Sequence, residues 1–172
     1  MNQIDWLFTK NFSKNEFSED PNKFADPVLI HSLQELRNEL GSSIYPSPVK
    51  GALARNYGSK KSQHYVGDYL KPVRKSTAID IFPEGRPIDC LVACLSNENI
   101  NGIGVYLGTT GVDGLPWIMF HIDIRPIDGK IPLIWIADKN NRYYYPQSDP
   151  SKWKLLQDER MIQLKRKEKK YV

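Results

Sequence analysis

The chain has 172 residues, of which 40% are hydrophobic and 26% charged, and its formal net charge is +4. This length suits one domain with a sizeable core, and the composition is that of a soluble globular protein. No apolar run approaches the roughly 20 residues that a membrane span needs, so no membrane partner is expected. The opening residues, MNQIDWLFTK, lack the layout of a signal peptide, which predicts synthesis in the cytoplasm.

The first clear element is a helix that follows a polar opening segment. Asp26 suits the N-cap, Pro27 the first helical position and Gly41 the stop. Apolar residues recur between them at helical spacing: Leu29, Leu33, Leu36 and Leu40. His31 lies off this leucine stripe, which predicts a histidine on the surface.

The middle of the chain alternates strand and helix patterns. A short strand in SSIYP leads into a loop rich in Pro, Gly, Ser and Lys, and STAIDIF (76–82) is the next strand. RPIDCLVACLSN (86–97) reads as a helix and GIGVYLG (102–108) as a strand. Cys90 and Cys94 are expected to be buried free thiols, because two cysteines make no disulfide framework and neither CxxC nor zinc-ribbon spacing is present.

Two strong strand patterns follow, WIMFHIDIRP (117–126) and KIPLIWIAD (130–138), and the Asp-Gly between them predicts a hairpin. Beyond them come a Tyr-rich segment, a short helix in SKWKLLQDERMIQL (151–164) and the basic tail LKRKEKKYV (164–172). The element order predicts a single α+β domain with a mostly antiparallel sheet and flanking helices.

The basic tail accounts for the positive charge, since the rest of the chain is close to neutral. Such a tail is typically a solvated end, and attraction to nucleic acid, to anionic wall polymers or to a partner protein is the functional alternative. A tail alone does not indicate a nucleic-acid-binding protein, so nucleic acid is not an expected partner.

Polar residues gather on one face of the predicted sheet. Alternation in WIMFHIDIRP puts His121, Asp123 and Arg125 in a row, opposite the isoleucines that must face the core. An ion pair beside a half-exposed histidine is one interpretation of this row. However, Asp80 also projects from a strand whose other face is apolar, and it follows His64 in the chain. Two imidazoles and a carboxylate on a sheet face form a zinc site with an open position, where a bound water becomes a hydrolytic nucleophile.

This pattern resembles the M15 peptidases, which are zinc D-alanyl-D-alanine carboxypeptidases and related phage and bacterial peptidoglycan endopeptidases that share a fold with hedgehog signalling domains. Their motif SxHxxGxAxD is matched here in two halves: Ser62, His64 and Gly67, then Ala78 and Asp80. The histidine precedes the aspartate by 16 positions instead of seven, so residues 68–76 look like an insertion. The resemblance implies an M15-like domain over 12–137, with an N-terminal extension (1–11) and a C-terminal extension (138–172).

The resemblance implies that His64, Asp80 and His121 bind Zn²⁺. Ser62 would lie beside the site among the substrate-binding residues, although a plain loop hydroxyl is the alternative. The family's acid three residues before the second histidine is replaced here by Ile118, which cannot transfer a proton. Other members carry an HxD pattern instead, which His121-Ile122-Asp123 resembles. Because Asp123 also lies on the same strand face as His121, it is the candidate general base, with support of a ligand or pairing with Arg125 as its alternatives.

Candidates for substrate binding are weaker matches to the family. Lys50 or Arg55 takes the place of the arginine that binds the substrate carboxylate, and bidentate recognition favours Arg55. Arg125 is a further candidate for substrate binding.

The function implied by the resemblance is a zinc-dependent peptidase that hydrolyses peptide bonds in peptidoglycan stem peptides. It would be phage-derived, acting at the bacterial cell wall as an endolysin or within a virion, with peptidoglycan peptides and other virion proteins as partners. The alternative is a catalytically inactive M15-like structural or binding module of a virion. The absent acid, the insertion and the weak arginine match favour this alternative.

Overall fold

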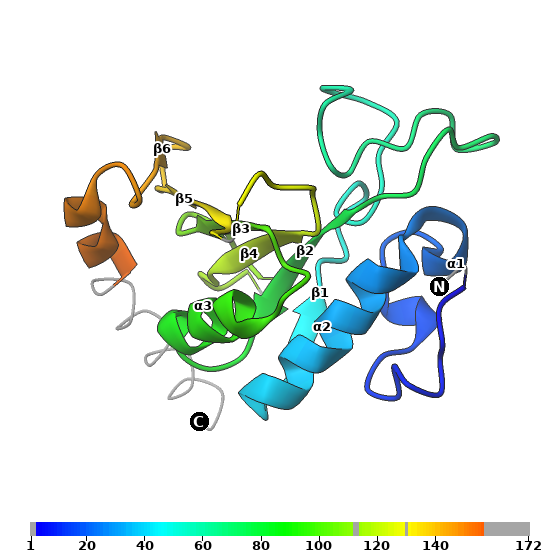
Figure 1. Ribbon diagram of the computed structural model, residues 1–172, viewed down its shortest axis with the longest axis horizontal. Coiled ribbons are helices and arrows are strands. Elements are labelled where there is room, and N and C mark those ends of the chain that lie inside the picture. Colours follow the sequence, from blue (N-terminus) through cyan, green and yellow to red (C-terminus); the bar gives the residue numbers. More distant parts are fainter. Residues whose placement is uncertain (1–2, 112–113, 130, 157–172) are drawn as a thin grey trace.

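The computed structural model describes residues 3–111, 114–129 and 131–156. In chain order the elements are a 3-10 turn (η1, Lys14–Glu16), α1 (Pro21–Phe24), α2 (Pro27–Leu40), β1 (Ile44–Pro46), β2 (Ala78–Pro83), α3 (Pro87–Ser96), β3 (Gly102–Tyr106), β4 (Met119–Asp123), β5 (Leu133–Ala137), β6 (Tyr143–Tyr144) and a second 3-10 turn (η2, Pro150–Trp153). Figure 1 shows the strands side by side with helices packed beside them. The protein is a single α+β domain, as the sequence predicts.

The sheet is mixed and has the strand order β1-β2-β4-β3-β5-β6. Neighbouring strands are antiparallel except for β3 and β5, which run parallel. The expectation of a mostly antiparallel sheet is confirmed.

The predicted hairpin between the two strong strand patterns is wrong. β4 and β5 do not pair with each other, because β3 lies between them and hydrogen-bonds to both. Asn101, just before β3, hydrogen-bonds to both flanking strands: its amide donates to the carbonyl of Asp123 in β4, and its own carbonyl accepts from the amide of Leu133 in β5. A local turn signal identifies a bend, whereas pairing of the flanking strands depends on a segment that is distant in the sequence.

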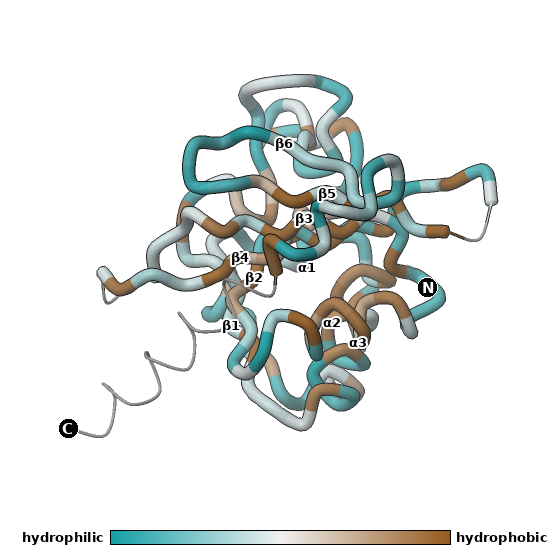
Figure 2. The backbone as a smooth tube through the Cα atoms, turned by 90° about the vertical axis from the view of Figure 1, so that its left-hand side faces the viewer, coloured by the Kyte–Doolittle hydropathy of each residue, from teal (hydrophilic) through white to brown (hydrophobic). Residues whose placement is uncertain are grey.

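Helices α2 and α3 cover one face of the sheet, as Figure 2 shows. The Asp26 side chain caps α2 by accepting a hydrogen bond from the amide of Val28, and Gly41 ends it with φ 59°. The core between helices and sheet is apolar and includes Leu29, Ile30, Leu33, Leu36, Cys90, Leu91, Cys94, Ile79, Ile81, Ile103, Phe120 and Ile122. The isoleucine face of β4 is therefore the core face, and the polar row lies on the other side of the sheet.

The two cysteines are buried free thiols on α3, as predicted. Burial raises the pKa of the Cys90 thiol well above its usual value, and a hydrogen bond with Cys94 adds to this effect. Since thiolate is the reactive form, Cys90 remains a packing residue.

The predicted surface position of His31 is wrong, because its side chain is only 8% exposed. The N-terminal segment crosses α2 there: the amide of Asp5 donates to His31 Nε2 over 3.1 Å, and Phe8 packs on the imidazole ring. A helix viewed in isolation gives no sign of a segment that covers its polar side.

Parts of both expected extensions pack onto the domain. Ile4 and Trp6 lie against the core, β6 adds a strand to the sheet, and Leu156 is buried in the core. Most of the helix expected over 151–164, and the basic tail, lie outside the described residues. Among the described residues, no helix has both the length and the apolar character needed to cross a membrane.

Candidate metal centre

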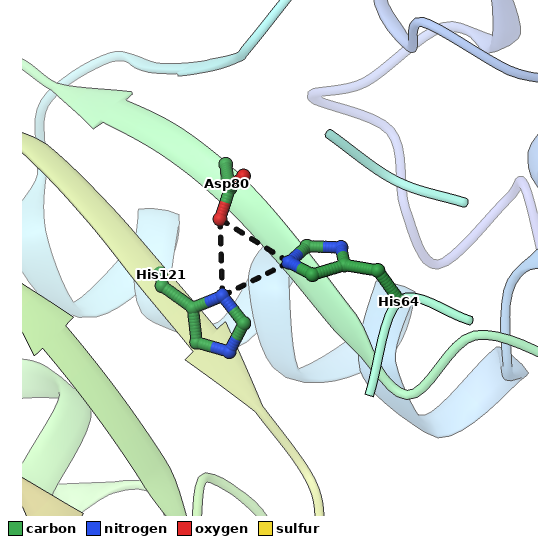
Figure 3. A group of neighbouring side chains, drawn as sticks. All are labelled: His64, Asp80 and His121. Atoms are coloured by element: carbon green, nitrogen blue, oxygen red, sulfur yellow. Dashed lines mark hydrogen bonds and ion pairs between the residues drawn. The ribbon is translucent and has the colours of Figure 1, made fainter. Parts of the chain in front are cut away.

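Three predicted ligands, His64, Asp80 and His121, point toward one another on the open face of the sheet (Figure 3). His121 Nδ1 lies 3.0 Å from His64 Nε2 and 3.0 Å from Asp80 Oδ1. The third side of the triangle, from His64 Nε2 to Asp80 Oδ1, measures 3.4 Å. The two histidines are buried and the aspartate is half-buried, and the group could hold a metal ion.

The sheet itself brings two of these ligands together. Asp80 on β2 and His121 on β4 are direct cross-strand partners, so their side chains emerge side by side on the same face. This pairing explains why an acidic residue interrupts the apolar pattern of β2. Its apolar neighbours Ile79 and Ile81 point the opposite way, into the core.

The third ligand comes from the loop that precedes β2. The carbonyl of His64 accepts a hydrogen bond from the amide of Arg55 over 2.9 Å, and the amide of Val66 donates to the carbonyl of Arg55 over 3.0 Å. The amide of Thr77 donates to the carbonyl of Gln63 over 3.0 Å, which fixes the loop against the start of β2. His64 is therefore placed by backbone hydrogen bonds on both sides.

The insertion at 68–76 turns out from this loop and returns to it without displacing the ligands. Gly67 has φ +84°, a conformation that favours glycine, and it forms a bridge with Pro72. The amide of Val73 donates to the carbonyl of Val66 over 2.9 Å, which closes the excursion. The histidine and the aspartate therefore meet although they lie farther apart in sequence than in the M15 motif.

Nδ1 of His64, the ring nitrogen that faces away from the cluster, lies 3.4 Å from the carbonyl oxygen of Leu53. The loop around this carbonyl is fixed by Glu19, whose carboxylate accepts hydrogen bonds from the amides of Gly51, Leu53 and Ala54 over 2.6 to 3.2 Å. An N–H at Nδ1 leaves Nε2 of His64 with a lone pair directed at the cluster.

The outer nitrogen of His121 has a carboxylate partner, because His121 Nε2 lies 3.0 Å from Asp123 Oδ2. Asp123 is fully buried and also accepts hydrogen bonds from Arg125, through the backbone amide and the guanidinium. Asp123 and Arg125 therefore lie behind the imidazole ring, on the side away from the ligand nitrogen.

The placement of Asp123 and Arg125 favours a positioning role over the general-base and substrate-binding roles expected for them from the sequence. Asp123 does share a strand face with His121, but both of its oxygens already accept hydrogen bonds, so it is badly placed to act as a general base on the cleft side. Arg125 is committed to Asp123 and lies over the ring of Trp135 at 5.6 Å, instead of reaching toward a substrate. Both residues hold His121 in position.

The electrostatics of the cluster favour a cation. Burial raises the pKa of Asp80, but its contacts with the imidazoles of His121 and His64 outweigh this effect and hold the pKa far below its usual value. Burial lowers the pKa of His121, yet its carboxylate neighbours Asp123 and Asp80 raise it above the usual value. Burial likewise raises the pKa of Asp123, and hydrogen bonds from Arg125 and His121 hold it at about 2. Two ionised carboxylates thus flank His121.

The donor set and its spacing fit a small divalent ion. Two imidazoles and one carboxylate are typical ligands of a zinc site with an open position, and ligands at about 2.0 to 2.1 Å in a tetrahedron lie about 3.3 Å apart. The observed separations of 3.0, 3.0 and 3.4 Å match that spacing. The three ligand atoms therefore need little movement to accept an ion.

Two glycines in β3 make room for the residues that surround His121. Gly104 lies opposite His121, and a Cβ added there would meet the ring of Trp135 at 2.5 Å. Gly102 lies opposite Asp123, and a Cβ there would meet its carboxylate at 2.3 Å. The Gly-x-Gly spacing in GIGVY is the sequence signal for this close packing, which strand periodicity alone does not indicate.

Replacing Gly102 by Ala tests this close approach. The added methyl would push the Asp123 carboxylate away from His121 and Arg125, and overpacking of this kind costs about 1 to 3 kcal/mol. We expect a lower free energy of unfolding by urea denaturation and weaker binding of a divalent metal ion, measured with Zn²⁺ as the probe. Unchanged stability together with unchanged metal affinity in Gly102→Ala would contradict this role for Gly102.

A pocket of about 260 Å³ adjoins Asp80 and includes Lys50, Arg55, Tyr57 and Met119 among its lining residues. Arg55 donates from Nη2 to Ser62 Oγ over 2.7 Å, and Ser62 Oγ also accepts from the amide of His64 over 3.3 Å. The Nε of Arg55 is buried and has no hydrogen-bond partner among the described residues. Ser62 thus links the ligand loop to an arginine that lines the pocket containing Asp80.

Comparison with known proteins adds no assignment: no family model matches the chain, and neither a curated protein nor a solved structure matches it significantly.

Proposed function

We propose that the protein is a zinc-dependent peptidase that hydrolyses peptide bonds in peptidoglycan stem peptides. The observation that carries the proposal is the convergence of His64, Asp80 and His121 within 3.0 to 3.4 Å of one another. These are the three residues that the resemblance to M15 peptidases implies as ligands. The proposal includes a hedgehog-like arrangement of the α+β fold and a phage origin, as an endolysin or a virion component acting at the cell wall.

Zinc suits this donor set because borderline-soft Zn²⁺ prefers imidazole nitrogen with a carboxylate oxygen in a tetrahedral site. When bound, the ion would polarise a peptide carbonyl and acidify a water molecule toward neutrality. The protein residues supply orientation. Asp123 accepts a hydrogen bond from Nε2–H of His121, which leaves Nδ1 as the ligand atom, and the carbonyl of Leu53 accepts from Nδ1–H of His64, which leaves Nε2 as the ligand atom.

Arg55 is the residue that we propose for substrate binding. Arg55 lines the pocket beside Asp80, and Lys50 adds a second positive charge to the pocket wall. A peptide carboxylate bound there would place the neighbouring peptide bond near the metal centre. Guanidinium is suited to this task because it recognises carboxylates through paired hydrogen bonds.

The second candidate function is a metal-binding module without turnover. It is favoured by the lack of a carboxylate that could act as the general base. The position three residues before His121 is Ile118, which is 1% exposed and faces the core, and both oxygens of Asp123 accept hydrogen bonds from His121 and Arg125. Asp80 is the sole carboxylate among the residues that line the pocket. In this alternative, the three ligands would serve a structural or binding role within a virion, without catalysis.

Cleavage of purified peptidoglycan separates the two candidates. We expect the zinc-loaded protein to release new amino termini in stem peptides, detected by mass spectrometry, and we expect a chelator to stop and zinc to restore the release. Asp80→Asn should abolish cleavage, whereas Asp128→Asn, an exposed aspartate, should leave it unchanged. Stoichiometric zinc without cleavage of any stem peptide would reject the peptidase and leave the binding module.

A further inference from the structure

Residues 48–76, here called the basic lobe, hold an uneven share of the positive charge. The lobe contains seven Lys and Arg residues and one acidic residue, Asp68, although the whole chain carries only +4. Six of the cations are exposed: Lys50, Lys60, Lys61, Lys71, Arg74 and Lys75. The lobe is therefore a strongly positive surface on a domain that is otherwise close to neutral or acidic.

These charges are not neutralised within the described part of the protein. None of its ion pairs includes a cation of the basic lobe. Arg74 and Lys75 donate to backbone carbonyls, which fixes their position without cancelling their charge. Glu19 accepts hydrogen bonds from three backbone amides of the lobe, and its single negative charge lowers the formal charge only from +6 for the lobe to +5 for the lobe with Glu19. The lobe consequently presents a positive potential to solvent.

Side-chain contacts hold the basic lobe in a defined conformation. Tyr69 donates its hydroxyl to the carbonyl of Ala54 over 2.5 Å and packs on Phe24 with ring centroids 5.1 Å apart. Arg74 connects the insertion to the carbonyls of Lys60 and Tyr65. In Figure 1 the lobe forms the cyan and green loops that project beyond the end of the sheet where β2 begins.

The same lobe carries a metal ligand and the pocket wall. His64 belongs to it, and Lys50 and Arg55 line the pocket that contains Asp80. A long anionic molecule held along the exposed cations would therefore lie next to the metal centre. This adjacency connects the charge of the lobe to the reaction proposed for the site.

We propose that the basic lobe binds a phosphodiester-bearing anionic polymer of the bacterial cell wall and so holds the wall against the metal centre. This inference rests on the proposed function, because it assumes that the substrate is part of that wall. Five of the six exposed cations are lysines, which bind phosphate as point charges without a fixed geometry. The exposed apolar side chains of the insertion, Leu70 and Val73, are aliphatic, and Tyr57 is the one aromatic residue of the lobe that is exposed. Single-stranded nucleic acid is bound by stacking successive bases on several exposed rings, which the lobe does not offer.

Sedimentation with wall fragments tests the proposal. The full-length protein is mixed briefly on ice with walls that carry phosphodiester polymers, or with the same walls stripped of them, and unbound protein is measured. The test variant is Lys60→Gln/Lys61→Gln/Lys71→Gln, whose ammonium groups make no hydrogen bond or ion pair with described residues. The matched control is Lys10→Gln/Lys139→Gln/Lys154→Gln, three exposed lysines outside the lobe.

We expect wild-type affinity for intact walls to fall about tenfold or more when salt rises from about 50 to about 200 mM, because screening weakens exposed charge contacts. The lobe variant should bind about tenfold more weakly than the wild type at low salt, and the control variant should bind normally. Equal binding to stripped walls, equal affinity of both triple variants, or preferential displacement by single-stranded DNA would overturn the proposal.

Failure of wall binding by the lobe can be distinguished from failure of the proposed peptidase activity. The lobe variant should still cleave an isolated stem peptide, because the metal ligands and Arg55 are intact in it. If the wild type binds intact walls through the lobe but cleaves no stem peptide, the peptidase is rejected while the wall-binding surface stands.

Discussion

His121→Ala is expected to lose zinc and, with it, all cleavage of stem peptides. His121 is central to the cluster, since its Nδ1 lies 3.0 Å from both of the other ligand atoms. A site with three protein ligands that loses one should bind zinc more than about a hundredfold more weakly, because even residues that only support a ligand contribute 10- to 100-fold in affinity. Competition with a chromophoric chelator measures the change in affinity directly.

His31→Ala is the matched control for this experiment. His31 is another buried histidine, 8% exposed against 7% for His121, and it also makes a hydrogen bond, but it lies far from the cluster on α2. Both variants lose a buried imidazole, so only the loss at the metal centre should change zinc affinity. Equal zinc affinity in His121→Ala and His31→Ala would contradict the assignment of the ligand.

Asp123→Asn is expected to weaken zinc binding by about 10- to 100-fold while leaving cleavage recoverable at high zinc. The carboxylate accepts from His121 Nε2 and is paired with Arg125, so the neutral amide both loosens the imidazole and removes the partner of the guanidinium. We expect the free energy of unfolding to fall by about 2 kcal/mol. Zinc titrations of cleavage rate, together with urea denaturation, measure both effects.

The zinc titration also separates the two roles considered for Asp123. A residue that only positions His121 can be compensated by more zinc, whereas a general base cannot. Asp138→Asn is the control, because Asp138 likewise pairs with an arginine, Arg142, but at the far end of β5. Cleavage that stays absent in Asp123→Asn at saturating zinc would restore the general-base interpretation.

The ligand triad could be predicted from the sequence because strand periodicity is local. Alternation alone put Asp80 and His121 on faces opposite to isoleucines, and the cross-strand pairing of β2 with β4 then makes them neighbours. His64 came from the motif despite the insertion, since the excursion at 68–76 closes on itself through Gly67 and Val73. These features depend on short stretches of chain.

Features that depend on distant segments could not be predicted in the same way. Alternation placed Asp123 beside His121 correctly, but it could not show that the carboxylate lies behind the imidazole ring and is held there by Arg125. The insertion of β3 between β4 and β5, and the N-terminal cover over His31, both arise from contacts between residues that are remote in sequence. Single-sequence patterns carry no information on such contacts.

The zinc content of the purified wild-type protein is the most direct test of the metal centre. After removal of metal with a chelator, incubation with excess zinc and dialysis, elemental analysis should find one zinc per chain, and X-ray absorption should show two imidazole ligands. Those ligands would correspond to His64 and His121. No retained zinc, or an ion without histidine ligands, would contradict the metal centre and the peptidase proposed on it.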